Sequence, residues 1–253
     1  MKNTQRLALY HTAPYEVKLV EEPIPDPDTG EVDLFDDSIT KNTRASYPLN
    51  CIPYILPSKR STHPKNVIFL TFDANGVMPP ISRLSHNQAL YHFISGYTSK
   101  VGGTEAGVGE APELTFSACF GAPFMVFHPA YYAQLLKENL EKFDVKTWLL
   151  NTGLVGGPAG IGERISIRHT RSILTSVLDG SLNKVEFEVD PWFGLVIPLT
   201  CPGVPDQMLN PSASWTNQDS YNNNIGQLVA QFKKNMLKYE ESTPQEVLLA
   251  GPM

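Results

Sequence analysis

The sequence predicts a mixed α/β fold, and three stretches carry the prediction. Residues 67–72 and 148–150 are apolar runs with the composition of buried strands. The second run leads into the glycine-rich residues 151–171, and a helical pattern of apolar residues follows, formed by Ile173, Leu174, Val177 and Leu178. A strand, a glycine loop and a helix in this order are the layout of a nucleotide or phosphate site, because glycines let backbone N–H groups approach an anion.

Composition and charge exclude several classes of protein. A hydrophobic content of 42% is enough for a globular core, and a net charge of −6 gives no general attraction to nucleic acid or to anionic membranes. No apolar run approaches the roughly 18 residues that span a bilayer. Cys51, Cys119 and Cys201 show neither paired nor metal-binding spacing. We therefore expect a cytoplasmic protein with no nucleic-acid or membrane partner and no metal site built from these cysteines.

The N-terminal segment carries few regular patterns. Residues 1–31 contain a turn-rich acidic stretch at 23–30, and we treat them as a divergent or poorly ordered segment separate from residues 32–253. Arg44 follows in an irregular stretch that is rich in proline. On the residues alone, such an arginine is a surface residue or a salt-bridge partner.

Residues 67–72 form the clearest strand, which we expect to be buried on both faces. Asp73 follows directly, and Asn75-Gly76 and Pro79-Pro80 then end the strand. An acidic residue at the end of a buried strand is a common site position in α/β proteins. The alternative is that Asp73 caps a turn.

A helix is expected to begin after Ser85, because Ser85 and Gln88 have the spacing of a capping box. Its apolar side is formed by Ala89, Leu90, Phe93 and Ile94. Residues 101–113 are rich in glycine and poor in large apolar groups, so we interpret them as a mobile loop, either a lid over a site or a linker.

The C-terminal half predicts further regular elements. Residues 116–127 look buried, and Pro129 has the position of a first helical residue. Residues 181–216 suggest short strands and extended connections. A last helix is expected at about 224–239, with one apolar stripe formed by Ile225, Leu228, Val229, Phe232 and Met236.

The glycine loop is not a Walker A loop. Gly157 and Gly162 have the required spacing, but Glu163 and Arg164 stand where that motif has lysine and serine or threonine. The loop could simply turn the chain. A purely structural turn, however, needs no basic residues, and four follow the glycines of this loop. They are Arg164, Arg168, His169 and Arg171.

Several stretches together resemble the C-terminal half of ATP-dependent phosphoenolpyruvate carboxykinase. The similarity runs in the same order from about residue 32 to 253. It is carried by residues 36–44, 63–66, 76–80, 91–98, 103–105, 116–121, 151–153, 170–171 and 250–252. The resemblance implies a mononucleotide-binding domain of the carboxykinase type, with a mixed sheet, flanking helices and a glycine-rich lid at about 101–113.

The resemblance also implies a reaction and site residues. Members of the family convert oxaloacetate and ATP to phosphoenolpyruvate, CO2 and ADP in gluconeogenesis, with Mg2+ and Mn2+ as cofactors. Arg44 matches an arginine that contacts substrate and the transferred phosphate of the nucleotide, so the resemblance makes it both catalytic and nucleotide-binding. Positions beside the nucleotide are matched by Arg164, Ile165 and Thr170, and lid positions by Gly102, Gly103, Thr104, Glu105 and Gly107.

Other parts of the family pattern are missing. The phosphate-binding loop, the metal ligands and the basic residues that hold oxaloacetate precede the resembling region and are not found in residues 1–31. Glu163 stands where lysine is common. We therefore expect a fragment that is inactive alone. The alternatives are a truncated, non-catalytic relative that binds a nucleotide or a partner, and an unrelated α/β domain that binds a phosphorylated ligand through residues 151–171. The oligomeric state does not follow from the sequence.

Overall fold

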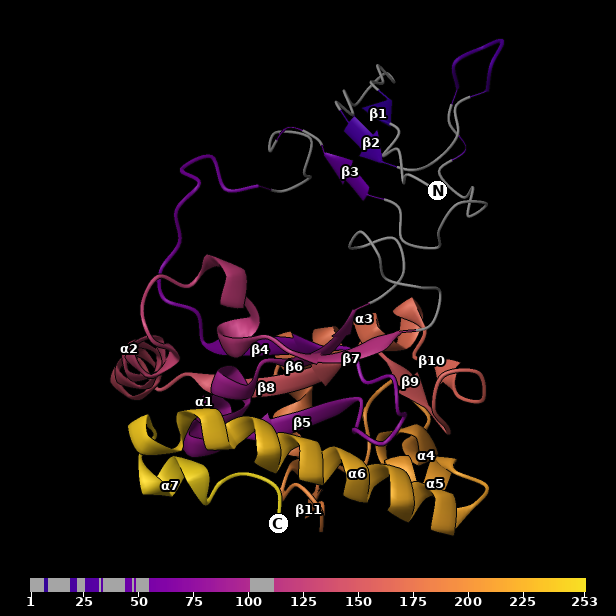
Figure 1. The fold of residues 1–253 in the computed structure, drawn as a ribbon. Helices are drawn as coiled ribbons and strands as arrows, with labels where there is room; N and C mark the ends of the chain where they lie inside the picture. The colour runs from indigo at the N-terminus through magenta and orange to yellow at the C-terminus, as the bar shows by residue number, and fades with distance from the viewer. Residues whose placement is uncertain are drawn as a thin grey trace. The chain divides into compact units, whose positions relative to one another are not determined.

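The computed structural model describes residues 26–31, 33, 48, 55–100 and 112–253, and also the backbone of strands β1 (Leu7–Ala8), β2 (Leu19–Glu21) and β3 (Arg44–Ser46) (Figure 1). The chain divides into two compact units. One contains residues 1–62 and 100–113, and the other contains residues 63–99 and 114–253.

The first unit contains an antiparallel sheet of order β1-β2-β3, in which Glu21 is paired with Arg44. Residues 26–31 form the turn that the proline-rich acidic stretch predicts. The Asp26 carboxylate accepts hydrogen bonds from the N–H groups of Asp28 and Thr29, at 3.0 and 2.7 Å, and from the Thr29 hydroxyl. These bonds, chiefly those from Thr29, lower the pKa of Asp26.

The second unit is built on a mixed five-stranded sheet of order β11-β12-β5-β8-β4. Its strands are β4 (Asn66–Thr71), β5 (Ile81–Leu84), β8 (Lys146–Asn151), β11 (Phe187–Val189) and β12 (Val196–Pro198). The pair β4–β8 is parallel and the other pairs are antiparallel. Two small sheets pair β6 (Tyr97–Lys100) with β7 (Glu113–Phe116) and β9 (Leu154–Val155) with β10 (Glu163–Arg164).

Helices flank this sheet. They are α1 (His86–Ser95), α2 (Pro129–Lys142), α3 (Ile167–Leu178), α4 (Asp206–Leu209), α5 (Pro211–Ser214), α6 (Gln218–Met236) and α7 (Gln245–Leu248). Short 3-10 turns are η2 (Ala118–Phe120), η3 (Ala122–Phe124), η4 (Ser181–Lys184) and η5 (Leu237–Ser242). The mixed sheet and flanking helices confirm the α/β prediction.

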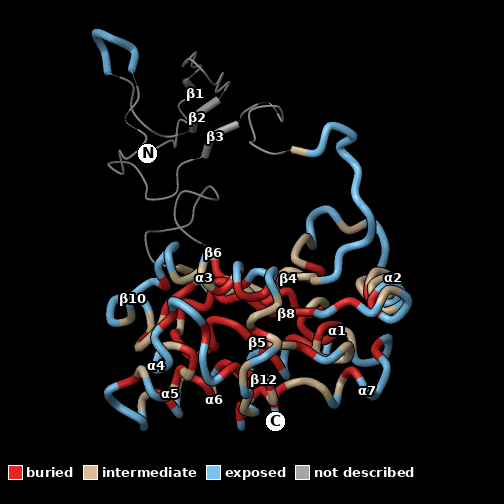
Figure 2. The backbone as a smooth tube through the Cα atoms, turned by 180° about the vertical axis from the view of Figure 1, so that it is seen from behind, coloured by how far each residue is buried: buried red, intermediate tan, exposed pale blue. Residues whose placement is uncertain are grey.

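The second unit has three layers, and alternating residues of β8 contact different cores. Leu149 belongs to the cluster formed with α1, α2 and α6. Trp148 and Leu150 belong to a second cluster, which includes Ile173 and Val177 of α3. Successive side chains of a strand point to opposite faces, so helices cover both faces of β8. Figure 1 shows α6 running along one side of the sheet and α3 on the other. In Figure 2 the buried backbone follows the central strands.

Several predicted helices are confirmed. Ser85 and Gln88 form both bonds of the capping box at the start of α1. Helix α2 begins at Pro129. The predicted apolar stripe of α6 is buried, although the helix begins at Gln218, six positions before the expected start. The polar run at residues 222–224 hid this first part of the helix from the apolar pattern. No helix in the described part of the chain is both long and apolar enough to cross a membrane.

Two expectations about burial are wrong. Among the described residues β4 pairs with β8 alone, and Leu70 is 60% exposed, so this strand is not buried on both faces. Residues 116–127 are not a buried segment. Two short turns direct Phe124 and Val126 outward, and these side chains are 82% and 86% exposed.

Candidate functional site

The carboxyl ends of the parallel strands β4 and β8 lie side by side, with Thr71 paired with Asn151. Both the N–H and the hydroxyl of Thr152 donate to the Thr71 carbonyl, at 2.9 and 3.2 Å, so the two chains stay together beyond the strands. Ligands of open α/β sheets bind outside the carboxyl ends of parallel strands. This edge is therefore where a site is expected.

Asp73 lies at this edge but is fully buried. Its Oδ1 accepts hydrogen bonds from the Asn75 N–H at 2.9 Å and the Tyr97 hydroxyl at 2.7 Å. Its Oδ2 accepts from the N–H groups of Val77 and Met78, at 2.7 and 2.8 Å. Because both oxygens are used within the protein, Asp73 organises the loop after β4. Of the two roles considered for this residue, the geometry supports the turn cap.

Asn151 joins the loops that follow β4 and β8. Its Oδ1 accepts from the N–H groups of Asp73 and Gly153, at 3.0 and 2.8 Å, and its Nδ2 donates to the Met78 carbonyl at 3.0 Å. A Cβ on Gly153 would lie 2.3 Å from the Asp73 carbonyl oxygen. This edge is consequently rigid, with little space between its two loops.

The glycine loop does not connect a strand directly to a helix. It lies between β9 and β10, which pair antiparallel through Leu154 with Arg164 and Val155 with Glu163. The N–H groups of Ile161 and Gly162 donate to the Pro158 carbonyl, and that of Ala159 donates to Ala74. These donors are therefore not free for an anion. The predicted strand–loop–helix layout is corrected to a hairpin loop followed by α3.

The glycines of this hairpin are needed for close backbone packing. A Cβ on Gly162 would lie 2.0 Å from the Gly157 carbonyl oxygen, and one on Gly76 would lie 2.1 Å from the same atom. Gly76 also has a positive φ of 68°. The glycines thus allow the hairpin loop to pack against the loop after β4.

Arg164, at the end of β10, places a cation over the carboxyl ends of β4 and β8. Its guanidinium carbon lies 5.1 Å from the centre of the Phe72 ring, and its Nε lies 3.5 Å from the Thr152 carbonyl oxygen. Phe72 follows β4 and Thr152 follows β8. Arg164 is exposed, and within the described part of the chain it has no carboxylate partner. It is thus available to an anionic ligand.

Ile165 and Thr170 lie on the segment that continues from Arg164. Ile165 is 3% exposed, and its N–H donates to the Gly153 carbonyl at 2.9 Å. Ser166 caps α3 by accepting a hydrogen bond from the N–H of His169, and Thr170 is half-buried in the first turns of this helix. The structure therefore holds Arg164 and Ile165 beside the loops of the sheet edge, with Thr170 just beyond them.

The remaining cations of the predicted cluster lie on α3. Arg168 and Arg171 are exposed, whereas His169 is half-buried and its Nδ1 is a buried atom without a hydrogen-bond partner among the described residues. The residues that position Arg164, namely Phe72 and Thr152, were not singled out from the sequence. Their positions at or just beyond the ends of two predicted strands, 67–72 and 148–150, are the available signal.

The other predicted site residues belong to the first unit, and most of them lie outside the described residues. Arg44 lies in β3 of the first unit, and only its backbone is described. The predicted lid residues Gly102, Gly103, Thr104, Glu105 and Gly107 lie outside the described residues. Glu113, the last residue of the predicted lid range, begins β7 and is exposed.

The described residues do not fit a divalent-metal site. They contain no group of three or more histidine, cysteine, aspartate or glutamate side chains that could hold an ion. Asp73, the acidic residue at the sheet edge, uses both carboxylate oxygens in hydrogen bonds to the protein. No step through a metal is therefore derived from these residues.

Comparison with known proteins gives one consistent result. A sequence model of the family described as "Phosphoenolpyruvate carboxykinase", in its ATP-dependent form, matches residues 1–207. This match includes residues 1–31, so the family similarity extends through the segment expected to be divergent.

Curated relatives agree with the family match. The chain is 53% identical over 219 residues to phosphoenolpyruvate carboxykinase (ATP) of Pelobacter propionicus, covering 87% of this chain and 41% of that protein. It is 51% identical over 234 residues to phosphoenolpyruvate carboxykinase (ATP) 1 of Salinibacter ruber, covering 92% of this chain and 44% of that protein. The chain thus spans about two fifths of the length of these relatives.

Proposed function

This chain belongs to the phosphoenolpyruvate carboxykinase family, and we propose that it is the nucleotide-binding part of an ATP-dependent phosphoenolpyruvate carboxykinase. The whole enzyme would convert oxaloacetate and ATP to phosphoenolpyruvate, CO2 and ADP in the cytoplasm, as a step of gluconeogenesis. A nucleotide is the ligand assigned to this chain.

The position of Arg164 is the observation that supports this proposal. Its guanidinium lies against Phe72 and the Thr152 carbonyl, over the ends of two parallel strands, and it is exposed. A fixed guanidinium at this edge matches the geometry and charge of a nucleotide's phosphates. Ile165 is proposed to support the nucleotide from the buried side and Thr170 from the first turns of α3.

Arg44 and the lid are assigned by family resemblance. Phosphoryl transfer spreads negative charge over the equatorial oxygens, and the proposal gives Arg44 the role of stabilising that charge while contacting the substrate. Residues 101–113 are proposed to exclude water and thereby protect the enolate from protonation. In the complete enzyme Mg2+ and Mn2+ would neutralise phosphate charge, and the proposal assigns them no ligand among the described residues.

Nucleotide binding tests the proposal directly. Titration of the 253-residue chain with ADP in a calorimeter is expected to show binding, and Arg164→Ala is expected to weaken it by about 10- to 100-fold, because a charged hydrogen bond contributes about 1.5–3 kcal/mol. Lys184→Ala is the control, since it removes an exposed cation of η4. ADP binding that is unchanged in Arg164→Ala, or weakened equally in both variants, would contradict the assignment.

A further inference from the structure

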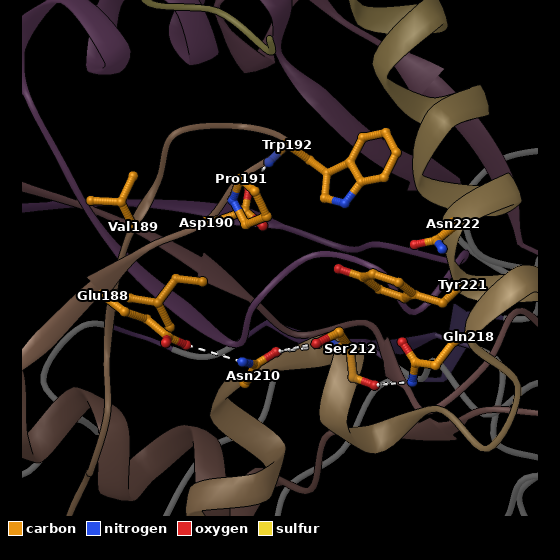
Figure 3. Close-up of a pocket in the computed structure, with 11 residues that line it drawn as sticks. Glu188, Val189, Asp190, Pro191, Trp192, Asn210, Ser212, Gln218, Tyr221 and Asn222 are labelled. Atoms are coloured by element: carbon orange, nitrogen blue, oxygen red, sulfur yellow. Dashed lines mark hydrogen bonds between the residues drawn. The ribbon is translucent and has the colours of Figure 1, made fainter.

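A second site is indicated by a cavity that the proposed nucleotide site does not use. It has a volume of about 370 Å³ and lies between the turn that follows β11 and the start of α6 (Figure 3). This volume is within the range of pockets that hold small molecules. Its lining includes two carboxylates, Glu188 and Asp190, and an indole, Trp192, and none of its lining residues is basic.

Asp190 has a carboxylate oxygen that the protein does not use. The side chain is 7% exposed, and its Oδ2 accepts hydrogen bonds from the N–H groups of Trp192 and Phe193. Its Oδ1 has no partner in the described part of the chain. Burial raises the pKa of Asp190, and the two N–H groups act in the opposite direction. This carboxylate oxygen can therefore accept a hydrogen bond from a ligand in the cavity.

Tyr221 brings a second unused polar atom to the same cavity. It is 4% exposed, and its hydroxyl has no hydrogen-bond partner among the described residues. Figure 3 shows this hydroxyl directed into the space, toward Asp190 and Pro191. Burial is the main cause of a raised pKa at Tyr221, and the nearby Asp190 carboxylate adds to it. The hydroxyl therefore stays protonated and can bond to a ligand in the cavity.

Glu188 also lines the cavity, and its carboxylate is held by Asn210. Asn210 donates its Nδ2–H to Glu188 Oε1 at 3.0 Å, and Asn210 Oδ1 accepts from the backbone N–H and the hydroxyl of Ser212. Neither Glu188 nor Asp190 has an ion-pair partner in the part of the chain that the structure describes. Two carboxylates without a neighbouring cation give the cavity a negative potential.

We propose that this cavity binds a primary ammonium group carried on a short alkyl stem. The N–H bonds of an ammonium match the unused oxygen of Asp190 and the Tyr221 hydroxyl oxygen, and the Glu188 carboxylate adds to the negative potential of the cavity. The stem would lie against the Trp192 indole, whose ring face also favours a cation. A divalent metal fits less well, because Ca2+ or Mg2+ takes six or more oxygens in a shell that two carboxylates do not supply.

The test uses n-butylammonium and the intact 253-residue chain, with binding followed by NMR titration and by tryptophan fluorescence. Binding is expected to weaken by at least about tenfold in Asp190→Asn and in Tyr221→Phe. Tyr221→Phe keeps the ring and its packing on Trp215. This variant therefore still tests ammonium binding if Asp190→Asn does not fold. Glu186→Gln is the matched control, because it removes an exposed carboxylate outside the cavity.

Further probes separate the alternatives. Equal binding of 1-butanol, displacement of n-butylammonium by stoichiometric CaCl2, or unchanged binding in Tyr221→Phe would overturn the proposal. If Nα-acetyl-lysine methylamide binds more tightly than n-butylammonium, the ammonium group that this cavity takes belongs to a lysine of a partner protein. If it binds more weakly, the ammonium group belongs to a free small amine. Arg164→Ala is expected to leave amine binding intact, so this result is independent of the proposed nucleotide site.

Discussion

The Tyr97 hydroxyl donates a 2.7 Å hydrogen bond to Oδ1 of the fully buried Asp73. Tyr97 begins β6 and Asp73 follows β4, so the bond joins two elements at the edge where Arg164 lies. Burial, followed by the nearby Asp73 carboxylate, raises the pKa of Tyr97 far above its usual range. Tyr97 therefore stays neutral and remains a donor.

Removing this donor is expected to destabilise the protein. Tyr97→Phe leaves a buried carboxylate with one partner fewer, which should lower the free energy of unfolding by about 1.5–3 kcal/mol. Tyr91→Phe is the matched control, since Tyr91 is also buried and no hydrogen bond of its hydroxyl occurs among the described residues. Urea unfolding measures both. An equal decrease in the free energy of unfolding in Tyr97→Phe and Tyr91→Phe would show that the hydrogen bond to Asp73 contributes no stability.

Two glycine substitutions should have opposite effects. In Gly162→Ala the new Cβ would lie 2.0 Å from the Gly157 carbonyl oxygen, so the hairpin must shift and a loss of more than about 2 kcal/mol is expected. Gly226 lies within α6 with open space around it, and Gly226→Ala should stabilise the protein by about 0.5–1 kcal/mol. Thermal unfolding measures both. A tolerated Gly162→Ala would mean that the loop packs differently.

Stability should fall in acid because of His92. Burial lowers the pKa of His92 to about 4, against 6.5 for the exposed group. The unfolded chain binds the proton more readily, so this contribution to stability is complete above pH 6.5 and is lost as the pH falls toward 4. At pH 5, protonation of His92 in the unfolded chain lowers the free energy of unfolding by about 2 kcal/mol.

A comparison of variants isolates this effect. Replacement of the ionisable ring in His92→Phe should flatten the dependence of unfolding free energy on pH between 6.5 and 4, relative to the wild type. The measurement is urea unfolding at several pH values. The same slope in His92→Phe and the wild type would assign the acid sensitivity to other groups.

Arg44→Ala tests the proposed catalytic role in the complete enzyme. We expect turnover to be nearly abolished, by about 100-fold or more, because a contact made in the transition state is lost. ADP affinity should change little, since Arg164, Ile165 and Thr170 are assigned to the nucleotide. A coupled assay for phosphoenolpyruvate formation measures turnover. Near-normal turnover would remove Arg44 from the mechanism.

The chain studied alone should associate with itself. Leu70 on β4 is 60% exposed, and Phe124, Val126 and Phe127 are also at least 60% exposed. Exposed apolar side chains and an available strand edge favour association. Light scattering should show assemblies that diminish in the double variant Phe124→Ser, Val126→Ser, with Leu249→Ser, at another exposed site, as control. A monodisperse wild-type chain would contradict the expectation.

The sequence predicted those features that depend on neighbouring residues. The capping box at Ser85, the proline start of α2 and the apolar stripe of α6 are local patterns, and all three are present. Residues 148–150 were expected to be buried because the run is continuously apolar, and they form the centre of β8. Short-range spacing was sufficient for each of these predictions.

The candidate site depended on contacts between distant segments. The sequence placed Arg164 beside a glycine loop, but only the fold brings it to Phe72, 92 positions earlier, and makes the loop a hairpin. The exposure of Leu70 likewise depends on which strand pairs with β4.

What the sequence by itself determined was the family, the helix boundaries set by caps and prolines, and the apolar faces of the helices. Only the tertiary structure decided that Asp73 is a loop cap, that Gly162 and Gly76 pack against Gly157, and that Asp190 and Tyr221 share a cavity. The physical reason is that capping and periodicity act over a few residues. Burial and hydrogen-bond satisfaction depend instead on which remote segments the chain brings together.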